Sequence, residues 1–189
     1  YPESAAPEES SRYECDVLFY GGADSDRMPY IVALLEAGLD VHLYGGYWDR
    51  HARTRPYFKG HADPATLRKA VHGARITLCL VRQANRDGHV MRTFEAPAMG
   101  ACMLTEDTPE HHELLGPNGA TTIYFSDVTS LVENAHRLLA RPEERRRLVD
   151  AARTWATQGS NTYADRLSTM LGAGVVQVMN TQQQHLVNL

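Results

Sequence analysis

The chain has 189 residues, 43% hydrophobic and 22% charged, which is typical of a compact globular domain and excludes a disordered or fibrous chain. A formal net charge of −4 argues against a generic nucleic-acid-binding protein, and no apolar run approaches the roughly 20 residues that span a bilayer. Cys15, Cys79 and Cys102 lie in apolar runs without the spacing of a metal site, so we expect buried free thiols in a reducing compartment and therefore a cytoplasmic protein.

Both ends of the chain lack the hydrophobic periodicity of its middle. Residues 1–14 include a polar run of Pro, Glu, Ser and Ala that is typical of a linker, and residues 175–189 are expected to form a tail. We therefore expect one domain over residues 15–174, cut at an interdomain linker from a longer protein. A processed mature protein is the alternative.

The first half of this domain alternates short apolar runs with helical spacing. The pattern predicts a strand over residues 15–20, a helix over 28–38 and a strand over 40–44 that ends at Gly45-Gly46, which together form a βαβ unit. A polar loop over 47–59, a helix over 64–72 and a β-branched strand over 75–81 follow.

The second half continues the alternation. Helices are expected over residues 91–100 and 110–115, strands over 102–105 and 121–125, and three closing helices over 128–140, 142–157 and 163–171. The order predicts an α/β fold: a Rossmann-like, doubly wound parallel sheet with helices on both faces, followed by C-terminal helices.

The glycine turn after the first strand is one candidate site, because ligands in such sheets bind beyond the carboxyl ends of the strands. Gly21 and Gly22 let a ligand approach the backbone. Arg27 at the start of the next helix opposes the helix dipole, a cost that makes sense if the residue faces a phosphate. The pattern is neither G-x-G-x-x-G nor a P-loop, and a plain turn with a solvated arginine is the alternative.

The exit of the strand over 75–81 is the most polar loop of the chain. Its candidate ligand-binding residues are Arg82, Asn85 and Asp87, followed by Arg92 and Glu95 in the next helix. Asp87 and Glu95 are separated by seven residues, and an ionised carboxylate can accept two hydrogen bonds from the vicinal diol of a ribose. Arg82 and Arg92 can neutralise a diphosphate. The alternative for Glu95 is an internal ion pair with Arg92.

Two other clusters favour structural roles. Adjacent His111 and His112 would point about 100° apart on a helix and cannot easily share a metal ion, so a surface helix end is the preferred interpretation. Tyr47 and Trp48 could stack on a base or sugar, but a buried loop anchor is favoured.

The run Arg92-Thr93-Phe94-Glu95-Ala96-Pro97-Ala98-Met99-Gly100 resembles a known family. It is similar to the nucleotide-binding half of GT-B glycosyltransferases, nearest the CgeB-like spore-maturation group of group 1 transferases. Residues 16–22 and 38–45, the closing helices through 161–166 and the linker-like residues 5–8 extend the resemblance over about residues 5–171.

This resemblance implies the C-terminal, donor-binding domain of a hexosyltransferase. The domain would bind a nucleotide-diphosphate sugar, the acceptor would sit on an N-terminal domain that this chain lacks, and transfer would need neither a metal ion nor another cofactor. In the superfamily the second glutamate of a Glu-x7-Glu pair holds the ribose and matches Glu95, whereas Asp87 departs from the pattern at the first position. Arg27 matches the basic residues that hold the diphosphate, without an evident lysine partner.

Two rival interpretations belong to other classes. One is a non-catalytic binding module that retains the fold, and the other is a different nucleotide-dependent α/β enzyme. The fold alone does not separate them from a transferase.

Overall fold

The computed structural model describes residues 2–82, 84, 88–158, 164–165 and 167–172. The chain divides into two compact units, residues 1–156 and 157–189. In the second unit, residues 164–165 and 167–172 are helical, in the region where the sequence predicts a helix. The sheet and the candidate site both belong to the first unit.

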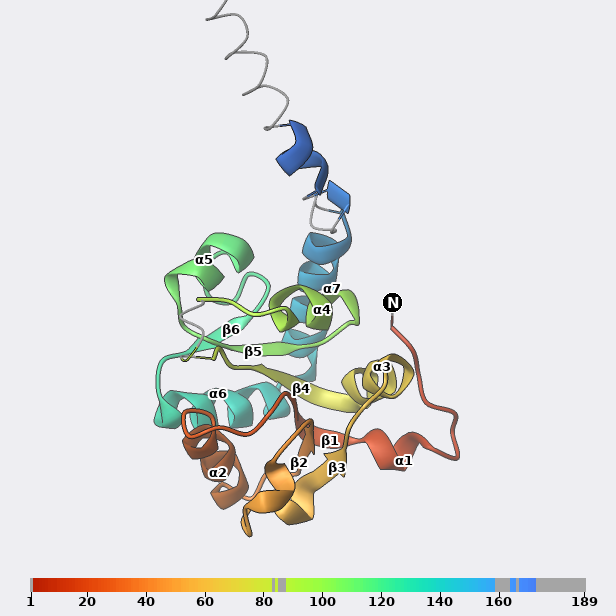
Figure 1. Ribbon diagram of the computed structural model, residues 1–189, viewed down its shortest axis with the longest axis vertical. Helices are drawn as coiled ribbons and strands as arrows, with labels where there is room; N and C mark the ends of the chain where they lie inside the picture. The colour runs from red at the N-terminus through yellow and green to blue at the C-terminus, as the bar shows by residue number, and fades with distance from the viewer. Residues whose placement is uncertain (1, 83, 85–87, 159–163, 166, 173–189) are drawn as a thin grey trace, which may run out of the picture. The chain divides into compact units, whose positions relative to one another are not determined.

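Six strands form one parallel sheet in the first unit (Figure 1). They are β1 (Cys15–Tyr20), β2 (Val41–Tyr44), β3 (Phe58–Gly60), β4 (Ala74–Cys79), β5 (Met103–Glu106) and β6 (Ile123–Phe125). The order is β3-β2-β1-β4-β5-β6, and each neighbouring pair is parallel. The chain thus returns from the β3 edge to place β4 beside β1, and a sheet of this type opens a crevice at that point of reversal.

One face of the sheet packs on α2 (Met28–Glu36), α6 (Val128–Ala140) and the first part of α7 (Pro142–Gln158). Ile31, Leu131 and Leu148 from these helices join Val17 and Phe19 of β1 in one fully buried cluster. The helical periodicity of the chain predicts these contacts, since each helix turns its apolar stripe toward the sheet.

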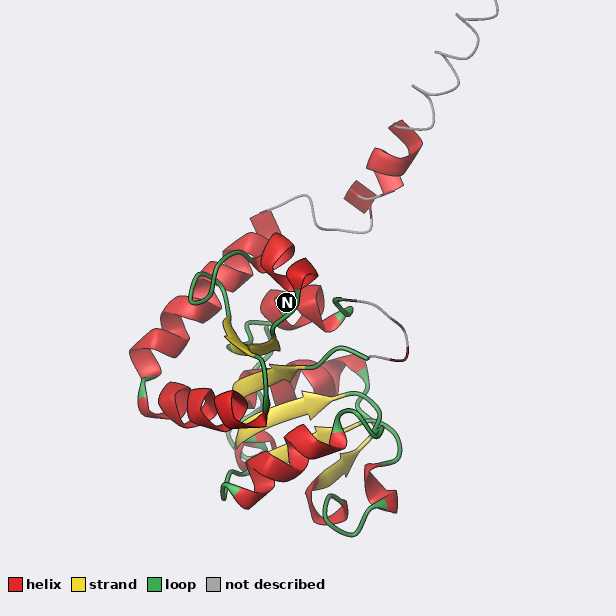
Figure 2. Ribbon diagram, turned by 90° about the vertical axis from the view of Figure 1, so that its left-hand side faces the viewer, coloured by secondary structure: helices red, strands yellow, loops and turns green. Residues whose placement is uncertain are grey.

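The opposite face packs on α3 (Pro64–Gly73), α4 (Arg92–Ala98) and α5 (Pro109–Leu115). Val71, Ala96 and Leu115 join Leu18 of β1 in a second buried cluster. Because successive side chains of a strand point to opposite faces, the two clusters lie on the two sides of the sheet. Figure 2 shows helices on both sides of the strands. The predicted doubly wound α/β fold is confirmed.

Two segments contain more structure than the sequence predicts. The expected loop over 47–59 holds two short 3-10 helices, η1 (Trp48–Arg50) and η2 (Arg55–Tyr57), and most of the edge strand β3. Within the expected linker, α1 (Ser10–Tyr13) forms, and Glu9 and Glu3 pair with Lys69 and Arg68 of α3 at 2.8 and 2.7 Å. The three residues of β3 are too few to show an alternation of apolar and polar side chains. The polar composition of residues 1–14 is typical of a linker but does not prevent this segment from packing on α3.

All three cysteines are free and buried, which confirms the prediction of buried thiols. Burial raises the pKa of Cys15 and of Cys102 to about 12. No helix in the described part of the chain has both the length and the apolar character needed to cross a membrane.

Candidate functional site

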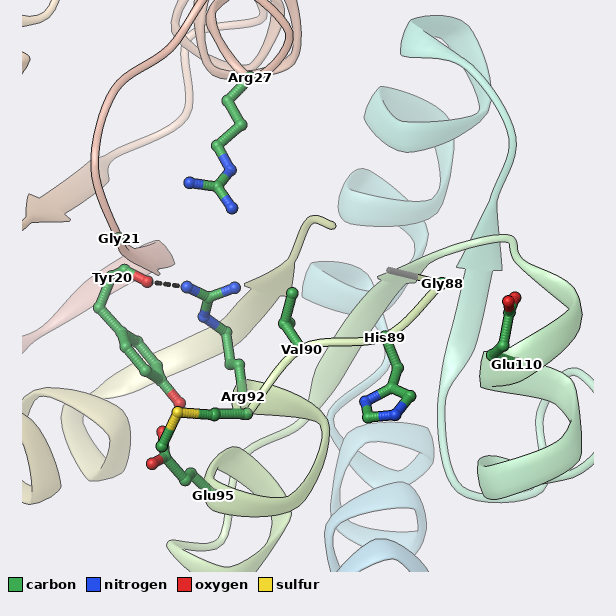
Figure 3. A pocket seen from close by; sticks show the side chains of 10 residues that line it. Tyr20, Gly21, Arg27, Gly88, His89, Val90, Arg92, Glu95 and Glu110 are labelled. Atoms are coloured by element: carbon green, nitrogen blue, oxygen red, sulfur yellow. Dashed lines mark hydrogen bonds between the residues drawn. The ribbon is translucent and has the colours of Figure 1, made fainter. Parts of the chain in front are cut away.

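A cavity of about 890 Å³ opens at the carboxyl ends of β1 and β4, where the strand order reverses (Figure 3). Its walls come from the exit of β1, the start of α2, the segment before α4, α4 itself and the first turn of α5. The lining residues are Tyr20, Gly21, Arg27, Gly88, His89, Val90, Met91, Arg92, Glu95 and Glu110. The sequence predicts this location, and four of its candidate residues line the cavity: Gly21, Arg27, Arg92 and Glu95.

Arg92 is buried and joins the two central strands. Its guanidinium donates hydrogen bonds to the carbonyl oxygen of Tyr20 and, at 3.4 Å, to that of Leu80. It also lies over the rings of Phe19 and Tyr20, with its central carbon 4.7 and 4.6 Å from the ring centroids. These contacts hold one cationic group at the cavity wall without a carboxylate partner among the described residues.

Arg27 supplies a second buried cation at the start of α2, and the residue is 7% exposed. Its guanidinium donates to the carbonyl of Gly22 at 3.1 Å and pairs with the Asp24 carboxylate at 3.4 Å. Burial lowers the pKa of Arg27, and Asp24 acts in the opposite direction. Gly22 therefore serves as a backbone anchor for Arg27, and the alternative of a solvated arginine is wrong.

The glycine turn is shaped by a close approach of two backbones. Gly45 has φ +113°, and a Cβ built on it would lie 2.5 Å from the carbonyl oxygen of Gly21. A Cβ on Gly21 would lie 2.9 Å from the Nη2 atom of Arg92. Trp48 is fully buried and donates from its indole nitrogen to the Gly21 carbonyl at 2.7 Å, which confirms its predicted role as a loop anchor. Tyr47 is 54% exposed, so the prediction of a buried loop anchor is wrong for this residue.

Glu95 lies one turn after Arg92 on α4 and is exposed. Among the described residues it forms no ion pair with Arg92, whose partners are main-chain carbonyls. The alternative of an internal Glu95–Arg92 pair is therefore wrong, and the carboxylate is open to the cavity. Arg82 is exposed and does not line the cavity, and Asn85 and Asp87 lie outside the described residues.

Unpartnered polar atoms gather around this cavity. Seven buried side-chain polar atoms of the described residues lack a hydrogen-bond partner. Four of them belong to lining residues: Tyr20 Oη, Arg27 Nε, His89 Nδ1 and Arg92 Nε. Each such group costs about 1–3 kcal/mol, so their concentration here is typical of a site where a ligand supplies the missing partners.

His111 corrects the prediction of a surface helix end. Its side chain is fully buried, and its ring lies 2.7 Å from the Glu106 carbonyl through Nδ1 and 3.1 Å from the Thr93 hydroxyl through Nε2. A carbonyl only accepts, so Nδ1 donates to it, and neutral Nε2 accepts from Thr93. Burial lowers the pKa of His111. The i,i+4 spacing of His111 and Leu115 is the signal that could have placed this histidine on the buried face of α5.

Glu110 is a lining residue that the sequence analysis does not single out. No group of three or more His, Cys, Asp or Glu within the described residues could hold a metal ion. Glu110 instead reaches the cavity from the first turn of α5. Nothing in its sequence surroundings shows that α5 begins beside the segment before α4.

Comparisons with known proteins agree with this geometry. A family model described as glycosyl transferase-like matches residues 29–172. No curated protein matches the chain. Among solved structures, sucrose-phosphate synthase from Thermosynechococcus elongatus has a TM-score of 0.65 at 16% identity, over 96% of this chain and 50% of that one. The Anabaena protein HepE in complex with UDP-glucose has a TM-score of 0.66 at 14% identity, over 90% and 54%.

A third solved structure is a single domain. The C-terminal CMP-Kdo binding domain of WaaA from Acinetobacter baumannii has a TM-score of 0.56 at 11% identity, over 79% of this chain and 97% of that one. Identities at this level show the fold alone. The chain spans about half the length of the synthase and of HepE, and nearly the whole of the WaaA domain.

Proposed function

This chain belongs to the glycosyl transferase-like family, and we propose that it is the C-terminal, donor-binding domain of a cytoplasmic GT-B glycosyltransferase of the CgeB-like group. It binds a nucleotide-diphosphate sugar, and the complete enzyme transfers the hexose to an acceptor held by an N-terminal domain. The observation that carries the proposal is the group of unpartnered buried polar atoms around the cavity at the strand reversal.

Arg27 and Arg92 bind the diphosphate. Both are buried cations on the cavity wall, and each keeps a buried Nε–H without a partner among the described residues. Preorganised cations are the groups that stabilise the negative charge on a leaving diphosphate. Their contacts with the Tyr20 and Gly22 carbonyls fix them before a ligand arrives, so little reorganisation is required.

Glu95 binds the ribose, because its exposed carboxylate lies one helical turn from Arg92 and can accept both hydroxyls of the diol. The Gly21 backbone lets the nucleotide approach the end of β1. Arg82, Asn85 and Asp87, which follow β4 in the sequence, remain donor-binding candidates. The WaaA structure, a C-terminal domain that binds CMP-Kdo, supports the same division of roles between two domains here.

The test is calorimetric titration of Glu95→Gln with UDP, GDP and ADP. The diol loses charge-assisted hydrogen bonds while an amide oxygen still accepts, so we expect a tenfold to hundredfold weaker affinity, about 1.4–2.8 kcal/mol. Stability in urea should stay close to that of the parent because the side chain is exposed. Glu133→Gln, an exposed glutamate of α6 outside the cavity, is the control.

Parental affinity in Glu95→Gln would refute the ribose assignment. If the parent binds none of the nucleotides and nucleotide sugars, donor binding is refuted and the non-catalytic module is supported. The isolated domain is expected to bind donor without transferring sugar, since positioning of the acceptor is the other domain's contribution.

A further inference from the structure

Glu110 faces the cavity but has no part in the function proposed so far. Its side chain is exposed, and it makes no hydrogen bond or ion pair with any described residue. It nevertheless lies against the segment before α4, because a Cβ built on Gly88 would overlap its carboxyl group. A free carboxylate thus stands directly beside the Gly88 backbone.

The position of Glu110 is fixed by its neighbours. The Thr108 hydroxyl donates to the Gly88 carbonyl at 2.6 Å and accepts from the His111 amide at 3.1 Å, which caps α5 and ties it to the segment before α4. The His111 ring adds a link from α5 to Thr93 of α4 at 3.1 Å. Glu110 lies between these two attachment points in sequence, so its backbone is held at the cavity wall by the start of α5.

The connectivity of a donor assigns the two ends of the cavity. In the donor, the diphosphate joins the ribose to the sugar. If the diphosphate lies at Arg92 and the ribose at Glu95, the sugar lies on the side of Arg92 that is opposite Glu95. In the view of Figure 3, Tyr20 and Glu95 lie on one side of Arg92, and Gly88, His89 and Glu110 lie on the other. A volume of about 890 Å³ is within the range of about 300–1,000 Å³ for small-molecule sites and leaves room for the sugar.

We propose that Glu110 is a specificity residue that accepts hydroxyl or amide hydrogens of the donor sugar and rejects sugars that carry a carboxylate. This inference rests on the proposed function. A neutral hexose or N-acyl amino sugar offers O–H and N–H donors to the carboxylate. A uronic acid would instead bring a second negative charge to the wall, and like charges held together are strongly unfavourable.

The experiment measures a ratio of affinities in the parent and in Glu110→Gln. UDP, UDP-glucose and UDP-glucuronate are titrated by calorimetry, and GDP, GDP-mannose and GDP-mannuronate replace them if GDP is the diphosphate that binds. In the parent we expect the neutral sugar nucleotide to bind at least tenfold more tightly than the uronate. In Glu110→Gln this ratio should fall toward one, and Glu110→Lys should reverse it.

Two comparisons separate this inference from the proposed function. The affinity for UDP alone should be unchanged in Glu110→Gln, whereas Glu95→Gln weakens it. Glu113→Gln, an exposed glutamate on the same helix outside the cavity, should keep the parental ratio. A ratio that does not respond to Glu110→Gln while UDP still binds overturns the specificity role alone. Failure of every nucleotide to bind the parent overturns the proposed function and this inference together.

Discussion

Replacing Gly45 with alanine tests whether the cavity depends on the close approach of two strand exits. The new Cβ would lie 2.5 Å from the Gly21 carbonyl oxygen, 2.8 Å from the Gly21 carbonyl carbon and 3.2 Å from its nitrogen. Restoring a carbon–oxygen contact of about 3.3 Å requires a shift of about 0.8 Å. Such overpacking costs about 1–3 kcal/mol, and the left-handed backbone at φ +113° costs about 1–3 kcal/mol more.

Gly60→Ala is the matched control because Gly60 has a similar φ of +97°, and an added Cβ there would meet nothing within 4 Å. The control pays only the backbone cost, so Gly45→Ala should be less stable than Gly60→Ala by about 2 kcal/mol in equilibrium urea unfolding. Displacement of Gly21 should also weaken UDP binding in Gly45→Ala alone. Equal losses of stability and affinity in the two variants would refute the argument.

Two further predictions concern Arg92 and His111, which are both buried. Arg92→Lys loses contacts with the Tyr20 and Leu80 carbonyls and with two aromatic rings. We therefore expect about 1–3 kcal/mol lower stability in urea and at least tenfold weaker UDP binding. A variant as stable as the parent would contradict this. Burial lowers the pKa of His111, so the neutral ring's contribution to the free energy of unfolding is complete above about pH 6.5 and is lost as the pH falls. The parent should therefore lose more stability than His111→Gln between about pH 7.5 and 5.5. Equal losses in the two proteins would contradict this.

The sequence predicts most of the fold because the spacing of apolar residues along a strand or helix can be read from a short stretch of sequence. Alternating apolar strands and helical stripes locate nearly every element of the sheet to within a few residues, and the order of strands and helices then implies a parallel sheet. The sequence does not predict β3, because its three residues, including the exposed Lys59, are too few to show a periodic pattern. Its place at the edge is decided by pairing with β2, which lies beyond any local pattern.

The candidate site is predictable only where it follows from topology. Gly21 and Arg27 follow β1, and Arg92 and Glu95 follow β4. Parallel strands bring their carboxyl ends together, which is why these four candidates line one cavity. His111 and Glu110 belong to a short helix whose start is attached to Gly88 and Thr93 by side-chain hydrogen bonds. Those bonds join residues 18 and 20 positions apart and have no periodic signature.

The burial of each site residue determines what its variants can reveal. Arg92 supports the fold and faces the cavity at once, since its guanidinium binds the carbonyls of two neighbouring strand exits, so any change there alters stability together with affinity. Glu95 and Glu110 are exposed and hold nothing else in place among the described residues, so their loss should alter affinity alone. In the proposed complex the donor contacts all three residues. The fold requires Arg92 but not Glu95 or Glu110, so a change at Glu110 can alter the choice of sugar without altering stability.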